Sequence, residues 1–373
     1  MMRPTIRSGE STWSLGRLRV LGTFLALVAL AGLATGCGPR RSAGEQEIWR
    51  FAIEETQGSV QDAYAQRFKE LVEERSGGEI NVKVYPYGTL GTSDQMTEQL
   101  HNGTIEFAMS SPGHLGKLIP EVQVFLLHFI FSDDEEVNNR VLGDPELLRT
   151  FDGLYEEKGL KLLTFFSEGW MVWTADRPIR TPADFGGVKF RVMTSPLLIE
   201  AYDAYGASPT PLPYSEVYSG LQLSMIDGQV NPVFAIEEMS FYEVSETMIF
   251  PKHALFITSA VTGEEFFEGL SPERRELVRS VVRDLQDEIF EIQTRFNQER
   301  LETIEERNPD LEVIRLTEEQ RERFREASLP VRETFVESVG PEGEEILNLI
   351  LEAVREEERK QERSAADAAD PSP

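Results

Sequence analysis

The sequence is poor in cysteine and histidine, and it lacks the short motifs that mark many enzyme active sites. Its one cysteine, Cys37, permits neither an internal disulfide nor a cysteine-based metal site. The four histidines are scattered, without the spacing of metal ligands. The HExxH motif, the phosphate-binding P-loop, the GxSxG elbow and the EF-hand loop are all absent. We therefore expect no enzyme activity, no cofactor and no metal.

Positive charge is also scarce. The 373 residues include 65 Asp and Glu but only 37 Lys and Arg, which gives a formal net charge of −28 at pH 7. Such a surface repels phosphate backbones, so we expect no nucleic-acid partner. A hydrophobic content of 40% with 9% aromatic residues indicates a globular protein. The length allows two ordinary domains with their own cores.

Residues 1–37 differ from the rest of the chain. Four arginines precede an uncharged apolar run over residues 20–33, and LATGC with Cys37 follows. This order indicates a secretory signal peptide, and the small residues before Cys37 resemble the processing site of bacterial lipoproteins, where the cysteine carries a lipid. An uncleaved membrane anchor and plain secretion are the alternatives, and all three export the body of the protein. Loss of residues 1–36 changes the formal charge to −31.

Predicted strands and helices alternate after a polar linker at residues 38–46. Residues 48–55 indicate a first strand, which we expect to be buried through Ile48, Phe51 and Ile53. A helical pattern ending in two glycines and a further alternating strand follow it. Alternation of this kind predicts an α/β fold with a mostly parallel sheet and helices on both faces.

A second alternating set includes a strand at residues 188–193 and a helix at residues 195–206. Two such units, joined by strands that cross between them, predict a bilobal architecture with a cleft. The apolar stripe of residues 271–307 predicts one long helix across both units. The expected parts are lobe I (47–168 plus about 257–295), lobe II with the C-terminal helices (169–256 plus about 296–360) and a disordered tail (361–373).

Arg191 is the strongest candidate for a binding residue. It lies in the middle of the predicted strand, shortly before the helix at residues 195–206. An arginine in a strand often holds two elements together by an ion pair, but a guanidinium also forms a bidentate fork for a carboxylate. Two features favour the second interpretation. The start of the helix attracts anions, and the turn DGQVNP at residues 227–232 adds an amide side chain.

Several sequence blocks, in the same order, resemble the solute-binding components of tripartite ATP-independent periplasmic (TRAP) transporters over roughly residues 47–340. The blocks are FKELVEERSGGEINVKVYPYGTLG, RPIRTPADFGGVKFRVMTSPLL, YGASPTPLPYSEVYSGLQ, MIDGQVNP and FYEV. The resemblance implies a periplasmic-binding-protein-like fold, in which two α/β domains close about a hinge on an anionic solute and a long helix spans both. It also implies delivery to a membrane permease, and binding of the solute carboxylate by Arg191 with help from Asn231.

Other blocks look most like the ectoine-binding members of that family. They are IWRFAIEETQGSVQDAYAQ, SPGHLGKLIP, EGWMVWTADRPI and NPVFAIE. Those proteins hold a zwitterionic ring by an arginine at the carboxylate, a glutamate at the N–H groups and aromatic side chains over the ring. The resemblance gives these roles to Arg191, Glu55, Tyr214 and Phe234, and a cation over aromatic faces has a physical basis. Core packing for the two aromatic residues and a surface position for Glu55 are the alternatives.

The sequence departs from the family patterns at three positions. His114 stands where the ectoine-binding members have an aromatic residue, and Tyr214 stands where they have a tryptophan. Trp170 and Trp173 are the candidates to supply the missing aromatic surface. Met171 stands where sialic-acid and dicarboxylate binders carry a second arginine, which favours a solute with one carboxylate.

Two sets of alternatives stay open at this point. The solute is an ectoine-like zwitterion or another organic anion, such as a 2-oxo acid, a sugar acid or a C4-dicarboxylate. The function is transport, ligand sensing by a lipoprotein or an unfamiliar extracytoplasmic activity. We expect a periplasmic protein, anchored through a lipid on Cys37, whose partners are a small carboxylate solute and the permease subunits. The sequence leaves the oligomeric state open.

Overall fold

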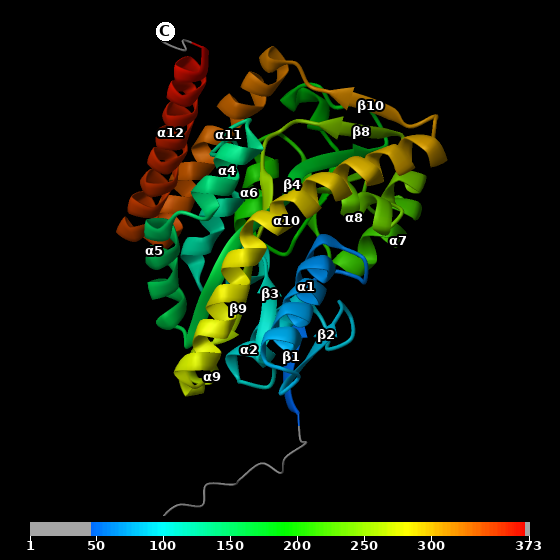
Figure 1. Ribbon diagram of the computed structural model, residues 1–373. Helices are drawn as coiled ribbons and strands as arrows, with labels where there is room; N and C mark the ends of the chain where they lie inside the picture. Colours follow the sequence, from blue (N-terminus) through cyan, green and yellow to red (C-terminus); the bar gives the residue numbers. More distant parts are fainter. Residues whose placement is uncertain (1–45, 370–373) are drawn as a thin grey trace, which may run out of the picture. The chain divides into compact units, whose positions relative to one another are not determined.

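The computed structural model describes residues 46–369, and the side chains of residues 46–365 (Figure 1). The expected signal peptide, Cys37 and all but the last residue of the expected linker therefore lie outside the described residues. None of the helices in the described part of the chain has the length and apolar character needed to cross a bilayer.

Ten strands lie at the centre of the described part of the chain, in two sheets that share one long strand. Their bounds are β1 (Glu47–Ala52), β2 (Ile80–Tyr85), β3 (Phe107–Ser110), β4 (Leu160–Ala175), β5 (Lys189–Val192), β6 (Ser208–Pro211), β7 (Gly228–Pro232), β8 (Thr247–Phe250), β9 (Leu255–Gly263) and β10 (Glu312–Arg315).

The strand order is β2-β1-β3-β9-β4-β7-β5-β6, with β8 pairing β4 and β10. Sheet A contains β2, β1, β3, β9 and the first part of β4, and sheet B contains the remaining strands and the last part of β4. Pairs distant from β4 and β9 are parallel, whereas the pairs made by these two strands with their neighbours are antiparallel. The sequence prediction of an α/β architecture is confirmed.

Helices cover the sheets on both sides. They are α1 (Val60–Arg75), α2 (Ser93–His101), α3 (Pro112–Leu115), α4 (Glu135–Leu142), α5 (Pro145–Glu156), α6 (Pro196–Asp203), α7 (Val217–Gln222), α8 (Val233–Glu238), α9 (Glu264–Gly269), α10 (Pro272–Arg307), α11 (Glu318–Val339) and α12 (Pro341–Ala369), with short 3₁₀ turns η1 (Pro120–Leu126), η2 (Pro182–Phe185), η3 (Tyr214–Glu216) and η4 (Phe241–Val244).

The long helix expected from the apolar stripe is α10, which begins after the N-cap Ser271. It packs against α1 and β4 and also against α8, so one long, curved helix contacts elements of both sheets (Figure 1). Its apolar residues Val278, Val281 and Leu285 join Phe68 of α1 in one buried cluster. Burial of such a stripe, rather than helix propensity alone, stabilises a helix of this length.

The strand β4 bends where it passes from sheet A to sheet B. Its pairing with β9 is irregular between Ser167 and Trp170, and Gly169 has a φ of +116°. A Cβ at residue 169 would lie 2.5 Å from Nδ2 of Asn297 on α10. Both the backbone angle and this close approach require glycine at the bend.

Two local predictions were wrong. β1 buries Trp49 and Phe51, whereas Ile48 is 50% exposed. Strand alternation explains this, because a strand that buries residues 51 and 53 on one face also places residue 49 there. The tail expected to be disordered is helical over residues 361–369, since α12 continues through the alanine-rich segment to Ala369. Nε2 of Gln361 also donates a hydrogen bond to Oδ2 of Asp134 at 2.6 Å.

Candidate functional site

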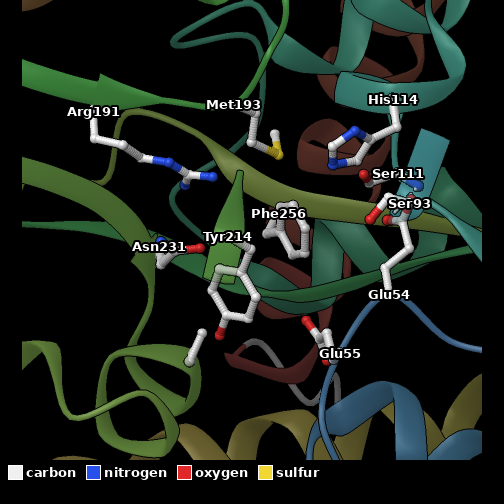
Figure 2. Close-up of a pocket in the computed structure, with 11 residues that line it drawn as sticks. Glu54, Glu55, Ser93, Ser111, His114, Arg191, Met193, Tyr214, Asn231 and Phe256 are labelled. Atoms are coloured by element: carbon white, nitrogen blue, oxygen red, sulfur yellow. Dashed lines mark hydrogen bonds between the residues drawn. The ribbon is translucent and has the colours of Figure 1, made fainter. Parts of the chain in front are cut away.

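A cavity lies at the carboxyl ends of β1, β3 and β5, where residues from sheet A and sheet B face each other (Figure 2). About 390 Å³ of space, open solvent included, lies between its walls. Its lining residues are Glu54, Glu55, Ser93, Ser111, His114, Arg191, Met193, Tyr214, Asn231, Ala235 and Phe256.

Strand alternation aims Arg191 away from the apolar core. Phe190 and Val192 are fully buried in the core on one face of β5, so Arg191 faces the opposite side. Its Nε and Nη2 donate hydrogen bonds to the carbonyl oxygen of Leu212 at 3.0 and 2.9 Å. The guanidinium is thus held by the segment after β6 and not by the first turn of α6, the helix start that the sequence places shortly after it.

The guanidinium of Arg191 is buried without a countercharge. The residue is only 2% exposed, its Nη1 has no hydrogen-bond partner, and no Asp or Glu of residues 46–365 forms an ion pair with it. Burial lowers the pKa of Arg191 to about 10, so the group still carries its charge at neutral pH. Because a buried unpaired charge costs several kcal/mol, this end of the cavity favours an anionic guest.

Carboxyl groups gather at the other end of the cavity. Glu54 and Glu55 follow β1 and line it, while Glu168 of β4 and Glu238 of α8 interact with Glu55. Figure 2 shows Glu55 and Arg191 on opposite sides of the space. Burial raises the pKa values of Glu168 and Glu238 to about 8, and burial followed by the charge of Glu168 raises the pKa of Glu55.

The first turn of α1 positions these acids. The backbone N–H of Gln61 donates to Oε2 of Glu55 at 3.3 Å, and its Nε2 donates to Oε1 of Glu168 at 3.0 Å. The Oε1 of Gln61 accepts a hydrogen bond from the backbone N–H of Glu54 at 2.8 Å. Carboxylates are favoured at a helix N-terminus, and here one glutamine connects two of them and the backbone of a third acidic residue.

Aromatic side chains occupy the space between the two ends. The rings of Tyr214 and Phe256 lie between Arg191 and Glu55 in Figure 2. Tyr214 is fixed edge-on by Tyr87 and Phe241, each with a ring centroid at 6.0 Å, and its buried hydroxyl has no hydrogen-bond partner among residues 46–365. A flat ring with a positive end and a negative end fits this order of charge, aromatic face and opposite charge.

His114 lies on the sheet A side of the cavity, in the short helix α3 that follows β3. Its Nδ1 is 3.5 Å from Oδ1 of Asp94, whose Oδ2 also accepts from Lys117 at 2.7 Å. The nearby imidazole of His114 is the main cause that lowers the pKa of Asp94 to about 2. His114 is therefore held in place by an ionised acid.

The structure brings five of the eight sequence-predicted solute residues into this cavity and places the other three elsewhere. The five that line it are Arg191, Asn231, Glu55, Tyr214 and His114. Their contact with a solute remains a prediction.

Three predicted residues do not line it. Phe234 lies in the core with Phe166 and Ile289, because the first turn of α8 turns its ring toward α10. Trp170 lines a separate cavity beside α10, and Met171 lines another beside His128. The alternative aromatic residue Trp173 is fully buried, with its Nε1 donating to Tyr202 at 3.0 Å.

Sequence reasoning missed several lining residues. Glu54 could have been predicted because it adjoins Glu55. Met193 could have been predicted because it lies two residues after Arg191, and strand alternation places it on the same side. Ser111 and Phe256 carried no local signal, since their place depends on the pairing of β3 with β9. Glu168 was hidden for the same reason, because only folding brings β4 against the loop after β1.

Comparison with known proteins assigns the family. Residues 51–338 match the model of "Bacterial extracellular solute-binding protein, family 7". The chain is 42% identical to the ectoine-binding periplasmic protein TeaA of Halomonas elongata, covering 85% of this chain and 93% of the relative. It is 40% identical to the ectoine/5-hydroxyectoine-binding periplasmic protein UehA of Ruegeria pomeroyi, covering 86% and 93%.

The fold agrees with solved structures of the same class. A TRAP periplasmic solute-binding protein from Marinobacter aquaeolei VT8, solved in an apo open form, superposes with a TM-score of 0.78 and 46% identity. That match covers 82% of this chain and 99% of the other. The chain therefore belongs to family 7 of the bacterial extracellular solute-binding proteins and is a periplasmic solute-binding protein of the TRAP type, not an enzyme.

Proposed function

We propose that this protein captures ectoine, or a close zwitterionic analogue with one carboxylate, and delivers it to the membrane permease subunits of a TRAP transporter. The observation that carries the proposal is the unpaired, buried guanidinium of Arg191 facing a cavity whose far end is acidic. The solute carboxylate pairs with Arg191, and the cationic N–H groups of its ring meet Glu55. Both relatives described above are named for this solute.

Charge separates this solute class from the alternatives. A C4-dicarboxylate would place its second negative end against Glu54 and Glu55, which have no Lys or Arg ion partner among residues 46–365. A 2-oxo acid or a sugar acid would satisfy Arg191 but leave those acids without a cation. Like charges held close together in a buried site cost several kcal/mol. A zwitterion satisfies both ends of the cavity.

Capture is proposed to proceed by closure of the two lobes, 47–168 with about 257–295 and 169–256 with about 296–360. Arg191, Tyr214 and Asn231 come from the second set of residues, whereas Glu55 and His114 come from the first. A solute that contacts both sets binds the closed form better than the open form, and this difference alone shifts the equilibrium. The bend of β4 at Gly169 lies where the two sets meet.

The proposal includes an anchor. The sequence before Cys37 resembles a lipoprotein processing site, and in this proposal the mature chain begins with a lipid-bearing Cys37 and stays at a membrane surface near its permease. Expression with and without Cys37→Ser, followed by fractionation and mass measurement of the mature N-terminus, tests this part. A mature mass without lipid would contradict it and leave solute binding untouched.

The decisive experiment is a melting-shift panel with purified, refolded protein. The panel contains ectoine, hydroxyectoine, pyruvate, galacturonate and succinate, preceded by mass spectrometry of whatever co-purifies. At a hundredfold excess over the dissociation constant, a ligand that binds only the folded state adds about 2.7 kcal/mol. We expect ectoine and hydroxyectoine to raise the melting temperature and succinate to leave it unchanged. A shift with succinate or galacturonate alone would replace ectoine by an organic anion.

A further inference from the structure

Gln61 connects two buried carboxyl groups beside the cavity, and neither has a cation partner among residues 46–365. Glu55 is 5% exposed and Glu168 is fully buried. Gln61 of α1 donates a hydrogen bond to each carboxyl group, each group perturbs the pKa of the other, and neither forms an ion pair with a Lys, Arg or His of residues 46–365. Oε2 of Glu168 has no hydrogen-bond partner in the described part of the chain. Two carboxyl groups bound by the same glutamine in a buried site disfavour double ionisation, so we expect them to hold at least one proton.

The donors around the pair are too few to replace that proton. Gln61 supplies one N–H to each carboxyl, at 3.3 Å to Glu55 and 3.0 Å to Glu168. The Ser59 side chain adds a weaker contribution at Glu55. The asparagine of α10 nearest to Glu168 donates to its backbone carbonyl and not to its carboxyl group. Amide donors of this kind do not balance the charge of a second carboxylate.

The other acids around the pair increase this effect, and the nearby cations act on other acids. Glu54 and Glu238 are acids that interact with Glu168, and Tyr214 faces Glu55 across the cavity. Arg300 of α10 lowers the pKa of Glu238 but pairs with Glu237. His114 acts on Glu54 from the sheet A side. Arg191 is the cation at the opposite end of the cavity, where the solute carboxylate binds.

We propose that solute capture expels a proton from this site, and that Glu168 sets the coupling by sharing that proton with Glu55 in the empty protein. The inference rests on the proposed function, because it requires a solute whose cationic end meets Glu55. That cation replaces the proton: the O–H bond of the Glu55–Glu168 pair breaks, the carboxylate of Glu55 pairs with the ring N–H groups, and the proton passes to the buffer. Glu168 acts through Glu55 and is a positioning residue.

Linkage fixes the sign of the pH dependence. A reaction that releases one proton becomes about tenfold more favourable for each pH unit, until the empty site has lost that proton by itself. Affinity for ectoine should therefore rise from pH 5.5 toward about pH 8 and level off above it, since the pKa of Glu168 in the empty site is about 8. Ectoine's own charges do not change in this range, because its carboxylate and amidinium titrate outside it.

Calorimetry on the whole protein measures the proton directly. Ectoine is titrated at pH 7 in phosphate and in Tris, two buffers with very different enthalpies of ionisation, and the difference in binding enthalpy gives the number of protons released. We expect roughly 0.5–1 proton per ectoine. Equal enthalpies in the two buffers, together with an affinity constant across pH 5.5–8, would overturn the inference while leaving the proposed function in place.

A pair of matched variants assigns the effect to Glu168. Glu168→Gln keeps the shape and can still accept from Gln61, but it cannot share a proton with Glu55 in the same way. Proton release should fall by at least half and the pH profile should flatten, with ectoine still bound. Glu305→Gln removes the same charge from an exposed position on α10 and should retain both properties of the wild type. A Glu168→Gln protein that releases as many protons as wild type would exclude Glu168 from the coupling.

The two levels of hypothesis fail differently. Absence of any heat or melting shift with ectoine at pH 8, where the acids are most ionised, contradicts the proposed function. Binding without proton release contradicts only the present inference. Should Glu168→Gln fail to fold, the two-buffer measurement on the wild type still decides whether a proton leaves.

Discussion

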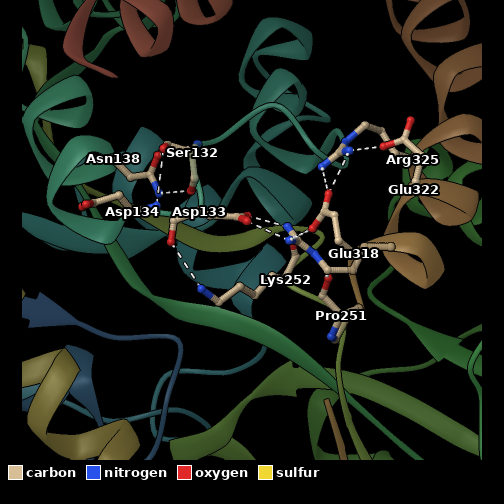
Figure 3. Close-up of polar contacts among 10 residues, drawn as sticks. Ser132, Asp133, Asp134, Asn138, Pro251, Lys252, Glu318, Glu322 and Arg325 are labelled. Carbon is tan, nitrogen blue, oxygen red and sulfur yellow. Dashed lines mark hydrogen bonds and ion pairs between the residues drawn. The ribbon is translucent and has the colours of Figure 1, made fainter. Parts of the chain in front are cut away.

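Two buried arginines in this protein have opposite surroundings. Arg321 of α11 is 7% exposed, close to the 2% of Arg191. Its Nη1 lies 2.7 Å from Oδ2 of Asp133 and 2.6 Å from Oε2 of Glu318, and its Nε donates to the carbonyl oxygen of Pro251 at 3.1 Å. The positions of Asp133, Glu318 and Pro251 around this point can be followed in Figure 3.

The difference shows what each arginine is for. Burial lowers the pKa of Arg321, but the hydrogen bond and charge of Asp133 outweigh burial and leave its pKa above the usual value. Burial is unopposed by any acid at Arg191, and its pKa is lowered. A guanidinium neutralised by its own chain ties α11 to the segment before α4 and to the connection between β8 and β9. A guanidinium left without a countercharge is stabilised only when a guest supplies one.

The largest expected effect is the loss of solute affinity in the Arg191→Ala variant. Loss of the carboxylate partner should weaken binding by about 2–5 kcal/mol, or at least about thirtyfold. The ligand-free protein should not lose stability, because relief of the buried charge offsets the lost packing and the two hydrogen bonds to Leu212. Titration calorimetry and ligand-free melting measure the two halves. An ectoine-dependent melting shift equal to that of wild type would rule out the clamp role of Arg191.

A substitution at Glu55 tests the contact with the cationic end of the solute in the same way. Glu55→Gln removes the negative charge that meets the ring N–H groups, so ectoine binding should weaken by about 2–3 kcal/mol. A simple monocarboxylate should bind this variant as well as it binds wild type, or better. Side-by-side titration with ectoine and pyruvate checks the expected crossover. Unchanged ectoine affinity would remove Glu55 from the site and favour a purely anionic solute.

The reverse pattern is expected for Arg321→Ala. Asp133 and Glu318 are exposed and stay hydrated, so the loss consists mainly of hydrogen bonds and packing, about 1–3 kcal/mol of unfolding free energy. Ectoine affinity should stay within about threefold of wild type once the variant is folded. Chemical denaturation and titration of the same preparation measure both. A large loss of affinity with intact stability would break the distinction drawn between the two arginines.

The smallest effect is the pH dependence of ligand-free stability. The folded-state pKa values of Glu168 and Glu238 are raised to about 8, so the stability tied to their protons is complete below about pH 4.5 and is lost as the pH rises through 8. Buried His128 acts oppositely, since burial lowers its pKa to about 3 and its contribution is lost only below about pH 6.5.

Between pH 7 and 9 the acids therefore dominate, and the ligand-free melting temperature should fall. The slope approaches about 1.4 kcal/mol per pH unit for each excess proton held by the folded state. Glu168→Gln should reduce the slope, and saturating ectoine should reduce it too. A melting temperature that rises from pH 7 to 9 would mean that these acids are already ionised in the empty protein.

Much of this molecule could be predicted from periodicity and capping. The helix α10, the glycine-terminated helix α1 and the strand that carries Arg191 all follow from local patterns. The burial of Arg191 without an acid could not be predicted, because it depends on which side chains the pairing of β5 with β6 and β7 brings near it. Phe234 shows the limit of resemblance: its residue type fits a solute contact, but its orientation at the start of α8 turns it into the core.

The bend at Gly169 affects how sequence differences between members of this family are interpreted. No other amino acid suits its φ of +116°, and even a methyl group would collide with Asn297. Selection should therefore keep residue 169 constant for mechanical reasons, although it touches no solute. A glycine retained at this position reflects the bend of the long strand, and it gives no information on which solute a family member binds.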